Sequence, residues 1–386
     1  MNHYNKVMNR PVKELYDVLK RLEERGYEAY LVGGAVRDMV LGAPIKDYDI
    51  TTNADPNAIR MAFQDHKTYD LGKKHGTVTV LAGTTKFEIT PFRLEDDYRD
   101  HRHPETVLFT SDLKDDLKRR DFTINALCMD SNDQIIDLFD GIRDIENRQI
   151  RAIGDPKARF NEDALRILRA LRFEAALDFE IEAETKKQIE ECAYLLECIS
   201  AERKKEELLK ILCCQSAFRI INENLRVFQT FMPFHRITRT RNNFSSPFYA
   251  LAYLLRNEKD LDLRSLKYSN QEIRLIEELI RSSKIDISDD THFIECLSSL
   301  DQKDILRFLN QYHRKDFNDR FEKLRPWICT LNELKIDGKT IRKYGYREKQ
   351  ISQIKQKLLD QVHQRKVNNT AEDLESCLAK NPSLLS

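Results

Sequence analysis

The feature that most constrains the fold is a change of pattern near residue 150. Before it, short apolar or alternating runs bounded by turn residues predict strands at "EAYLVGG", "YDITT", "GTVTVLAG", "KFEITPF" and "QIIDLFD". They follow an amphipathic helix, "VKELYDVLKRLEERG", that ends at Gly26. From "RFNEDALRILRALRFEAAL" onward, apolar residues recur three and four apart and extended runs almost vanish. We therefore predict an α+β chain with a small mixed sheet first and helices after it.

Charge and composition set limits on the class of protein. The 386 residues hold 64 Lys and Arg against 64 Asp and Glu, so nucleic-acid binding would require a local basic patch. No apolar stretch is long enough to span a bilayer, and the first ten residues lack the apolar core of a secretion signal. The eight cysteines include no C-x-x-C pair, which is typical of reduced thiols. We expect a globular cytoplasmic protein with no membrane contact.

A second feature, "LVGGAVRDMVLG", spans residues 31–42. It predicts a strand, a tight turn at Gly33 and Gly34, and a short helix that ends at Gly42. Glycines before a helix let an anion approach the exposed backbone N–H groups, and Arg37 adds a charge-assisted contact one turn later. A glycine pair is also common in ordinary turns, so this motif alone leaves that alternative open.

The stretch "KDYDIT" supplies two carboxylates. Asp47 and Asp49 lie two residues apart on a predicted strand, so both side chains point to the same face. Two carboxylates that close repel each other, and the usual compensation is Mg²⁺, which takes hard oxygen ligands together with substrate phosphates. The alternative is a solvated pair at a strand end, but beside a phosphate-binding turn the pair predicts a nucleoside triphosphate site. Glu88, between Phe87 and Ile89 on another predicted strand, is a candidate third ligand or else a surface residue.

These motifs resemble the signature of the DNA polymerase beta-like nucleotidyltransferases. The longer strings "LVGGAVRDMVLG", "DYDITT", "LKRRDFTINALCMD" and "NEDALRILRALRF" are similar to those of class II CCA-adding tRNA nucleotidyltransferases and the related bacterial poly(A) polymerases. The resemblance is close over residues 1–215 and general beyond them. It implies a nucleotidyltransferase head over residues 1–150, a helical neck over 151–215, a helical body over 216–300 and a helical tail over 301–386.

The resemblance also implies the reaction and its site. Such an enzyme adds C, C and A to the 3′ end of tRNA from CTP and ATP, with Mg²⁺ as cofactor and no obligate protein partner. Asp47 and Asp49 correspond to the catalytic, metal-binding aspartates. The nucleotide-binding positions correspond to Gly33, Gly34, Arg37, Arg120, Asp121, Asn125, Asp163, Arg166, Arg169 and Arg172, and base selection corresponds to Glu162, Asp163 and Arg166.

Selection of C and A by side chains has a physical basis. On one helix, Asp163 and Arg166 would be neighbours on the surface, with Ile167, Leu168 and Leu171 on the opposite side. Cytosine and adenine both present an amino donor beside a ring-nitrogen acceptor, whereas uracil and guanine present the reverse. One carboxylate beside one guanidinium would therefore accept C and A, because a buried donor that faces a donor costs about 1–3 kcal/mol. The alternative is an ion-paired, solvent-exposed helix face.

The stretch "FRLEDDYRDHRHPETVLF", residues 92–109, is polar and rich in charge, which predicts a mobile loop. In the family a loop here is linked to the switch from adding C to adding A, and CC-only enzymes lack it. The "DHRHP" element, Asp100 to Pro104, therefore favours addition of the terminal adenosine. An A-adding enzyme and a poly(A) polymerase share the same motifs and stay open as alternatives. A non-catalytic tRNA-binding protein is disfavoured, because a carboxylate pair repels RNA.

A basic segment lies near the end of the chain. Residues 335–366 hold ten Lys or Arg against three Asp or Glu, with two tyrosines among them. This composition favours contact with a phosphate backbone, and the alternative is a solvated helix face. We expect weak RNA contacts at Lys339, Arg342, Lys343 and Arg347.

Overall fold

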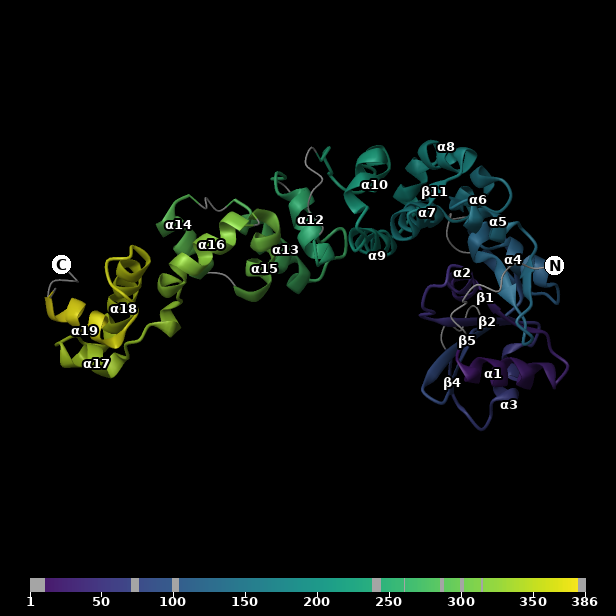
Figure 1. Cartoon of the computed structure of the whole chain (residues 1–386), viewed down its shortest axis with the longest axis horizontal. Coiled ribbons are helices and arrows are strands. Elements are labelled where there is room, and N and C mark those ends of the chain that lie inside the picture. Colours follow the sequence, from purple (N-terminus) through teal and green to yellow (C-terminus); the bar gives the residue numbers. More distant parts are fainter. Residues whose placement is uncertain are drawn as a thin grey trace. The chain divides into compact units, whose positions relative to one another are not determined.

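The computed structural model describes residues 11–70, 76–98, 104–237, 244–259, 261–284, 288–298, 302–313 and 315–380 (Figure 1). The chain divides into two compact units, Met1–Arg236 and Ile237–Ser386. The first unit combines a sheet with helices, and the described part of the second unit is helical, as predicted. Across the described ranges, no helix is both long and apolar enough to cross a membrane. The finer division into head, neck, body and tail stays a prediction.

A seven-stranded sheet organises the first half of the first unit. Its strand order is β3-β4-β5-β2-β1-β8-β9, with β2 and β5 parallel and the other neighbours antiparallel. The strands are β1 (Ala29–Val32), β2 (Tyr48–Thr52), β3 (Lys67–Asp70), β4 (Val78–Ala82), β5 (Thr85–Pro91), β8 (Leu127–Met129) and β9 (Ile135–Asp137). All five predicted strands are present. The sequence analysis missed β3 and β8, which are too short to show a clear alternation.

Short helices cover and connect these strands. They are α1 (Lys13–Glu23), α2 (Gly34–Val40), α3 (Pro56–Ala62), α4 (Leu113–Lys118), the 3₁₀ turn η1 (Thr123–Asn125) and α5 (Gly141–Glu146). Helix α1 buries Leu15, Val18, Leu19 and Leu22, whose three-and-four spacing places them on one face, and it contacts β1 and α3. Its chain leaves the helix direction at Gly26, where φ is +83°.

We predicted a loop for the polar stretch from residue 92 to residue 109, and this prediction is wrong. The described residues of the stretch form an antiparallel pair of strands. Strands β6 (Arg93–Tyr98) and β7 (Pro104–Phe109) form a separate two-stranded sheet in which Arg93 pairs with Phe109. Leu94, Leu108 and Phe109 are exposed, so these apolar positions do not mark the buried face by which a strand is recognised. Residues 99–103, which include most of the "DHRHP" element, lie outside the described residues.

The second half of the first unit is helical. After β10 (Gln149–Ile150), which pairs with β11 (Glu180–Ile181), it consists of α6 (Pro156–Glu162), α7 (Leu165–Leu177), α8 (Ala183–Glu191), η2 (Ala193–Cys198), α9 (Ala201–Leu212), α10 (Ala217–Glu223) and α11 (Leu225–Phe228). Helix α7 packs against α9, and α6 packs against α8 (Figure 1). Ile167, Leu168 and Leu171 of α7 are fully buried, which confirms the predicted apolar side of this helix.

The second unit contains two clusters of packed helices. Its elements are α12 (Pro247–Leu255), α13 (Asn270–Ser282), α14 (Asp290–Ser298), α15 (Gln302–His313), α16 (Lys315–Leu324), η3 (Arg325–Trp327), η4 (Leu331–Glu333), α17 (Gly338–Lys343), α18 (Glu348–His363) and α19 (Ala371–Lys380). Phe308 lies against the rings of Phe244, Tyr249 and Tyr312 in one cluster. The other cluster buries Ile341, Ile354, Leu358, Val362 and Leu374, which joins α17, α18 and α19.

Candidate functional site

A polar cavity of about 630 Å³ lies in the first unit. Its lining consists of Gly33, Gly34, Arg37, Asp47, Asp49, Arg93, Arg119, Arg120, Asp121, Asn125, Asp163, Arg166, Arg169, Arg172, Phe173 and Arg203. Eight arginines against four aspartates leave an excess of four positive charges, which favours a polyanionic ligand. Twelve of these residues are predicted site residues. The structure therefore brings positions spread over more than a hundred residues of sequence into one cavity.

The glycine turn forms one wall of the cavity. Gly33 precedes α2 with a φ of +78°, and a Cβ there would lie 3.2 Å from the Arg120 Nη1 atom. Both the backbone angle and the close approach of Arg120 therefore favour glycine at this position. Arg37, at the middle of α2, is only 9% exposed and donates from Nη1 to Asn125 Oδ1 at 2.7 Å and from Nη2 to Asp38 Oδ1 at 2.7 Å. These bonds fix the guanidinium at the cavity wall.

The two predicted aspartates both reach the cavity. Asp47 comes directly before β2 and Asp49 is the second residue of that strand. In the parallel pair of β2 and β5, Asp49 lies opposite Glu88, which confirms that Glu88 is on the neighbouring strand. Desolvation by the cavity walls raises the pKa of Asp49, and the negative charges of Glu88 and Asp47 raise it further, while Arg120 opposes them. Negative charge is thus concentrated at one end of a positive cavity.

This end of the cavity suits a divalent cation. Asp47 and Asp49 present hard oxygen donors toward the cavity, and a cation bound there would offset both the desolvation of Asp49 and its repulsion by Asp47. Among the described residues, no group of three or more His, Cys, Asp or Glu is arranged to hold a metal ion. Two carboxylates with waters and substrate phosphates completing the shell match the habit of Mg²⁺. Glu88 does not line the cavity, and its role as a third ligand stays a prediction.

Asp116 is a buried acceptor that the sequence analysis missed. Its side chain is fully buried at the end of α4 and accepts from Thr51 Oγ1 at 3.0 Å, Arg119 Nη2 at 2.7 Å and Arg120 Nη2 at 3.2 Å. Burial alone would raise the pKa of Asp116, but the charges of Arg120 and Arg119 outweigh it and lower the pKa. Burial likewise opposes the charge of Arg120, and Asp116 outweighs it, so the pKa of Arg120 is raised. Asp116 therefore holds two cavity arginines charged and in place.

A chain of polar bonds links the glycine turn to helix α7. Asn125 accepts from Arg37 and donates from Nδ2 to Asp121 Oδ1 at 3.1 Å. Asp121 Oδ1 also accepts from the Phe122 backbone N–H at 2.8 Å, and its Oδ2 accepts from Arg169 Nε at 2.7 Å. Burial would raise the pKa of Asp121, but the charge of Arg169 and the bond from Asn125 hold it well below its ordinary range. Asp121 and Asn125 thus orient Arg37 and Arg169.

The prediction that Asp163 and Arg166 share one continuous helix is wrong. Helix α6 ends at Glu162, and α7 begins at Leu165; Asp163 lies in the break with extended backbone angles, φ −139° and ψ 102°. Its Oδ1 atom accepts from the Leu165 backbone N–H at 3.1 Å, as in a helix cap. Asp163 is therefore not part of a continuous helix surface. Both Asp163 and Arg166 nevertheless line the same cavity.

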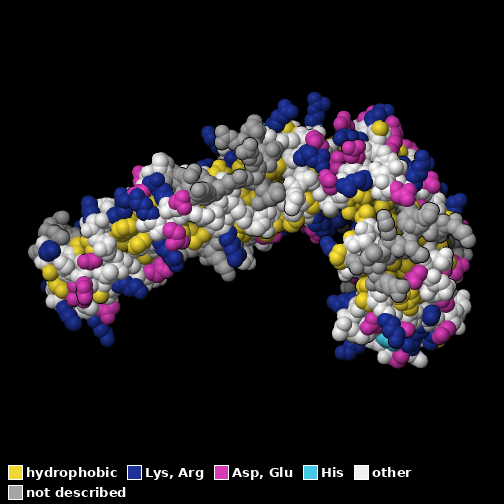
Figure 2. Space-filling model, viewed as in Figure 1, with side chains coloured by type: hydrophobic (Ala, Val, Ile, Leu, Met, Phe, Trp, Pro, Cys, Tyr) yellow, Lys and Arg dark blue, Asp and Glu magenta, His cyan; other side chains and the backbone are white. Residues whose placement is uncertain are grey.

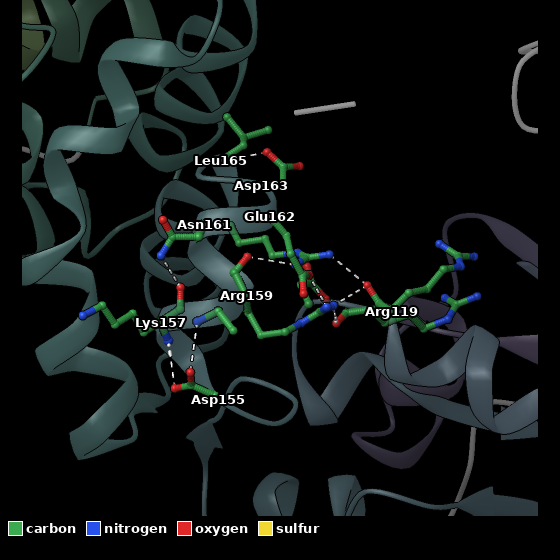
Figure 3. A network of polar contacts seen from close by, with 12 residues as sticks. Arg119, Asp155, Lys157, Arg159, Asn161, Glu162, Asp163 and Leu165 are labelled. Atoms are coloured by element: carbon green, nitrogen blue, oxygen red, sulfur yellow. Dashed lines mark hydrogen bonds and ion pairs between the residues drawn. The ribbon is translucent and has the colours of Figure 1, made fainter. Parts of the chain in front are cut away.

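Arg166 is fixed by hydrogen bonds to residues of α6 and to Arg119; Figure 3 shows Arg119, Arg159 and Glu162 within this network of polar contacts. The Arg166 Nη1 atom donates to Glu162 Oε2 at 2.6 Å and to the Arg159 carbonyl at 2.9 Å, and its Nη2 atom donates to the Arg119 carbonyl at 2.9 Å. Arg159 also donates to Glu162 and to the carbonyls of Arg119 and Arg120. We call Arg159, Glu162 and Arg166 the neck clasp, because they join α6 and α7 to the backbone before Asp121. Glu162 does not line the cavity, and it acts here through its two arginines.

Helix α9 adds two residues that the sequence analysis did not single out. Arg203 donates from Nη1 to Asp163 Oδ1 at 3.2 Å and from Nη2 to Asp163 Oδ2 at 2.8 Å. One turn later, the buried Glu207 forms an ion pair with Arg172, with Nε and Oε2 2.7 Å apart. Burial lowers the pKa of Arg172 and Glu207 opposes that effect. Helix α9 therefore supplies a counter-charge to a cavity residue on each of two successive turns.

The other cavity residues that were missed are Arg93, Arg119 and Phe173. The Phe173 ring carries the Arg172 guanidinium 4.3 Å from its centroid and those of Arg37 and Arg169 at 5.3 and 5.5 Å. A sequence signal existed for Arg119, since it lies three residues after Asp116 in "DLKRRD", a spacing that joins side chains on a helix. No local signal links Arg203 to Asp163, because 40 residues separate them.

The predicted RNA-contact residues lie in the second unit and are not among the lining residues of this cavity. Lys339, Arg342 and Lys343 are on α17, Arg347 immediately precedes α18, and all four side chains are exposed. Arg342 forms an ion pair with Glu348, with Nη2 and Oε2 2.9 Å apart. Figure 2 shows Lys and Arg side chains interspersed with Asp and Glu on the visible face of this unit. RNA binding by these four residues stays a prediction.

Comparisons with known proteins bear on this cavity. Residues 29–151 match the family described as "Poly A polymerase head domain", and residues 178–235 match "Probable RNA and SrmB- binding site of polymerase A". A CCA-adding enzyme of Lactobacillus helveticus is 36% identical over 384 residues, which cover 94% of this chain and 95% of that relative. A CCA-adding enzyme of Bacillus pumilus is 49% identical over 217 residues, which cover 55% of this chain and 54% of that relative.

The same similarity is found among solved structures. The crystal structure of Bacillus stearothermophilus CCA-adding enzyme in complex with CTP superimposes with a TM-score of 0.75 and 28% sequence identity. The superposition covers 97% of this chain and 98% of that one, so it includes both units of the chain.

Proposed function

This chain belongs to the family of CCA-adding enzymes, and from that premise we propose that it adds C, C and A to the 3′ end of tRNA from CTP and ATP. The observation that carries the proposal is the composition of one cavity. It combines a carboxylate pair at the start of β2, an excess of arginines and a carboxylate–guanidinium pair from the neck. A triphosphate needs the arginines, transfer of a nucleotide needs the carboxylate pair, and choice of a base needs a donor beside an acceptor.

The reaction is the attack of the tRNA 3′-hydroxyl oxygen on the α-phosphorus of the nucleotide. A new phosphodiester bond forms, the bond to the β-phosphate oxygen breaks, and pyrophosphate leaves. Asp47 and Asp49 would hold Mg²⁺, which as a Lewis acid supplies charge compensation for the attacking and leaving oxygens. Arg37 and Arg120, fixed by Asn125 and Asp116, bind and orient the triphosphate and offset its negative charge.

Base selection is proposed for Asp163 and Arg166. The Arg166 Nη2 group gives one N–H to the Arg119 carbonyl, and its second N–H can meet the ring-nitrogen acceptor of cytosine or adenine. Asp163 supplies the acceptor for the amino group of the same bases. The clasp residue Glu162 supports this arrangement by holding Arg166 from behind. Uracil and guanine would place an acceptor against Asp163 and a donor against Arg166.

Two further parts of the proposal concern the tRNA-binding surface and the cellular location. Lys339, Arg342, Lys343 and Arg347 would contact the tRNA backbone, since all four are exposed on adjoining elements. The location would be the cytoplasm, because all eight cysteines are free thiols, which a reducing compartment maintains. We propose no obligate protein partner.

The test is an incorporation assay on three tRNA transcripts that end at the discriminator base, after C, and after CC. Each transcript is offered CTP, ATP or both, with Mg²⁺. Completion of CCA on all three supports the proposal. Addition of a single A to the CC-ended transcript alone would make the chain an A-adding enzyme, and long A tails would make it a poly(A) polymerase. In a parallel reaction a chelator is added and Mg²⁺ is left out, which should abolish nucleotide addition.

A further inference from the structure

We propose that Arg203 is a positioning residue for base selection, which acts by fixing the plane of the Asp163 carboxylate. Arg203 lies on α9 and lines the cavity, and both of its terminal nitrogens donate to Asp163, at 3.2 Å and 2.8 Å. A guanidinium that contacts both oxygens of a carboxylate restrains its rotation, which a single hydrogen bond does not. The inference rests on the proposed function and concerns how the same site distinguishes bases.

The hydrogen bonds to Asp163 leave a single direction for a base. A carboxylate has about four acceptor positions, two on each oxygen. Oδ1 is occupied twice, by the Leu165 backbone N–H and by Arg203 Nη1, and Oδ2 is occupied once, by Arg203 Nη2. The remaining acceptor position is on Oδ2. Arg203 therefore leaves Asp163 with one acceptor for the amino group of cytosine or adenine, in a fixed orientation.

The surroundings show why this restraint is needed. Asp163 lies in the break between α6 and α7, and the hydrogen bond from the Leu165 backbone N–H at the start of α7 contacts only its Oδ1 atom. Arg166 and Arg169 line the same cavity, and their positive charges would attract the Asp163 carboxylate away from this orientation if it could rotate. Arg203 is in turn supported by α9, which packs on α7 and has Leu208 and Ile211 buried in the core. The restraint thus comes from a rigid element.

Two substitutions of Arg203 distinguish an effect of its geometry on Asp163 from an effect of its positive charge alone. Arg203→Met removes the guanidinium, and Arg203→Lys keeps the positive charge but cannot contact both oxygens in one plane. Both variants should discriminate less well between bases. On the discriminator-ended transcript the ratio of kcat/KM for CTP to that for UTP should fall about tenfold, and on the CC-ended transcript the ratio for ATP to GTP should fall by the same factor. A tenfold change is the order expected for one misplaced hydrogen bond. Arg219→Met, which removes an exposed arginine of α10 paired with Glu223, is the control and should leave both ratios unchanged.

A second measurement tests whether Arg203 acts through Asp163. In an Asp163→Ala background, Arg203→Met should produce no further change in either ratio, because the carboxylate that it orients is absent. Thermal unfolding of each variant is recorded, and Arg203→Lys decides the matter if Arg203→Met does not fold. Unchanged ratios in Arg203→Lys, even with a lower kcat/KM for every nucleotide, would overturn the inference and leave Arg203 a structural role. Failure of the unsubstituted chain to add C or A at all would instead contradict the proposed function.

Discussion

The Arg169 Nε atom lies 2.7 Å from Oδ2 of Asp121, and this pair joins the neck helix α7 to the chain that follows α4. Asp121 in turn holds Asn125, which holds Arg37 beside the glycine turn. The sheet part and the neck helices are therefore connected through side chains that also form the cavity wall. A change at this pair should affect both stability and nucleotide binding.

Stability should depend on pH through Asp121. Its pKa is held below the ordinary value of 3.8, so the carboxylate stabilises the fold above that value, and the contribution is lost as pH falls toward the lower folded-state pKa. Asp121→Asn should lower the free energy of unfolding at pH 7 by about 2 kcal/mol, because a largely buried Arg169 loses its partner. It should also flatten the acid branch of a plot of melting temperature against pH.

The control for this prediction is Asp178→Asn, which removes an exposed carboxylate paired with Arg148. Exposed pairs contribute about 0–1 kcal/mol, so the control should follow the unsubstituted protein closely. An acid branch as steep in Asp121→Asn as in the unsubstituted protein would show that another group carries the pH dependence.

Asp47→Ala and Asp49→Ala should each abolish incorporation of CTP and ATP without unfolding the protein. Both side chains face the cavity and neither belongs to the buried core, so their removal takes away metal-binding oxygens and little packing. Single-turnover incorporation and thermal unfolding are measured for both variants at several Mg²⁺ concentrations. Retained activity in either variant would remove that residue from the metal site.

The neck clasp should support stability more than a surface arginine does. Arg159 is 8% exposed and donates to two backbone carbonyls and to Glu162, so Arg159→Met should leave buried acceptors unsatisfied and cost about 2 kcal/mol. Calorimetric unfolding should show a lower melting temperature for the transition of the first unit. Arg143→Met, on the exposed side of α5, serves as the matched control. Equal melting temperatures for the two variants would contradict the assigned role of the clasp.

Charge reversal at Lys339, Arg342 and Lys343 should weaken tRNA binding similarly for all tRNA sequences. These side chains are exposed on α17, and removal of phosphate contacts should reduce the slope of log binding constant against log salt concentration. Because Arg342 already pairs with Glu348, its share should be smaller than that of either lysine. Reversal of Arg25 and Lys86, exposed in the first unit, is the control. An unchanged salt slope in the α17 variant would rule out this surface as the tRNA contact.

Local patterns predicted much of the fold and, of the cavity, the residues Gly33, Gly34, Arg37, Asp47 and Asp49. The strand at Tyr48–Thr52 and the turn at Gly33 follow from alternation and glycine placement, which act over a few residues. The resemblance supplied Arg120 and Asp163, which local patterns do not single out. Neither source indicated that a cap at Asp163 breaks the helix, because the apolar periodicity continues across the break.

The contacts that the sequence analysis missed join residues that lie far apart in the sequence. Arg203 meets Asp163 across 40 residues and only because α9 packs on α7. Asp116 is recognisable as a buried hydrogen-bond acceptor only in the folded structure, where Thr51 of β2 lies beside it. The strands β6 and β7 pair with each other but are rich in polar and charged residues, so their sequence pattern resembles that of a loop. Tertiary packing, which a single sequence does not display, determines all three.

The central claim is that one cavity selects both C and A, and the most direct test is the Asp163→Ala variant with all four nucleotides. Single-turnover incorporation is measured on the discriminator-ended transcript and on the CC-ended transcript. The account predicts that the preference for CTP over UTP and the preference for ATP over GTP fall together, each about tenfold or more. Loss of one preference with the other intact, or no change in either, would contradict selection by a single site.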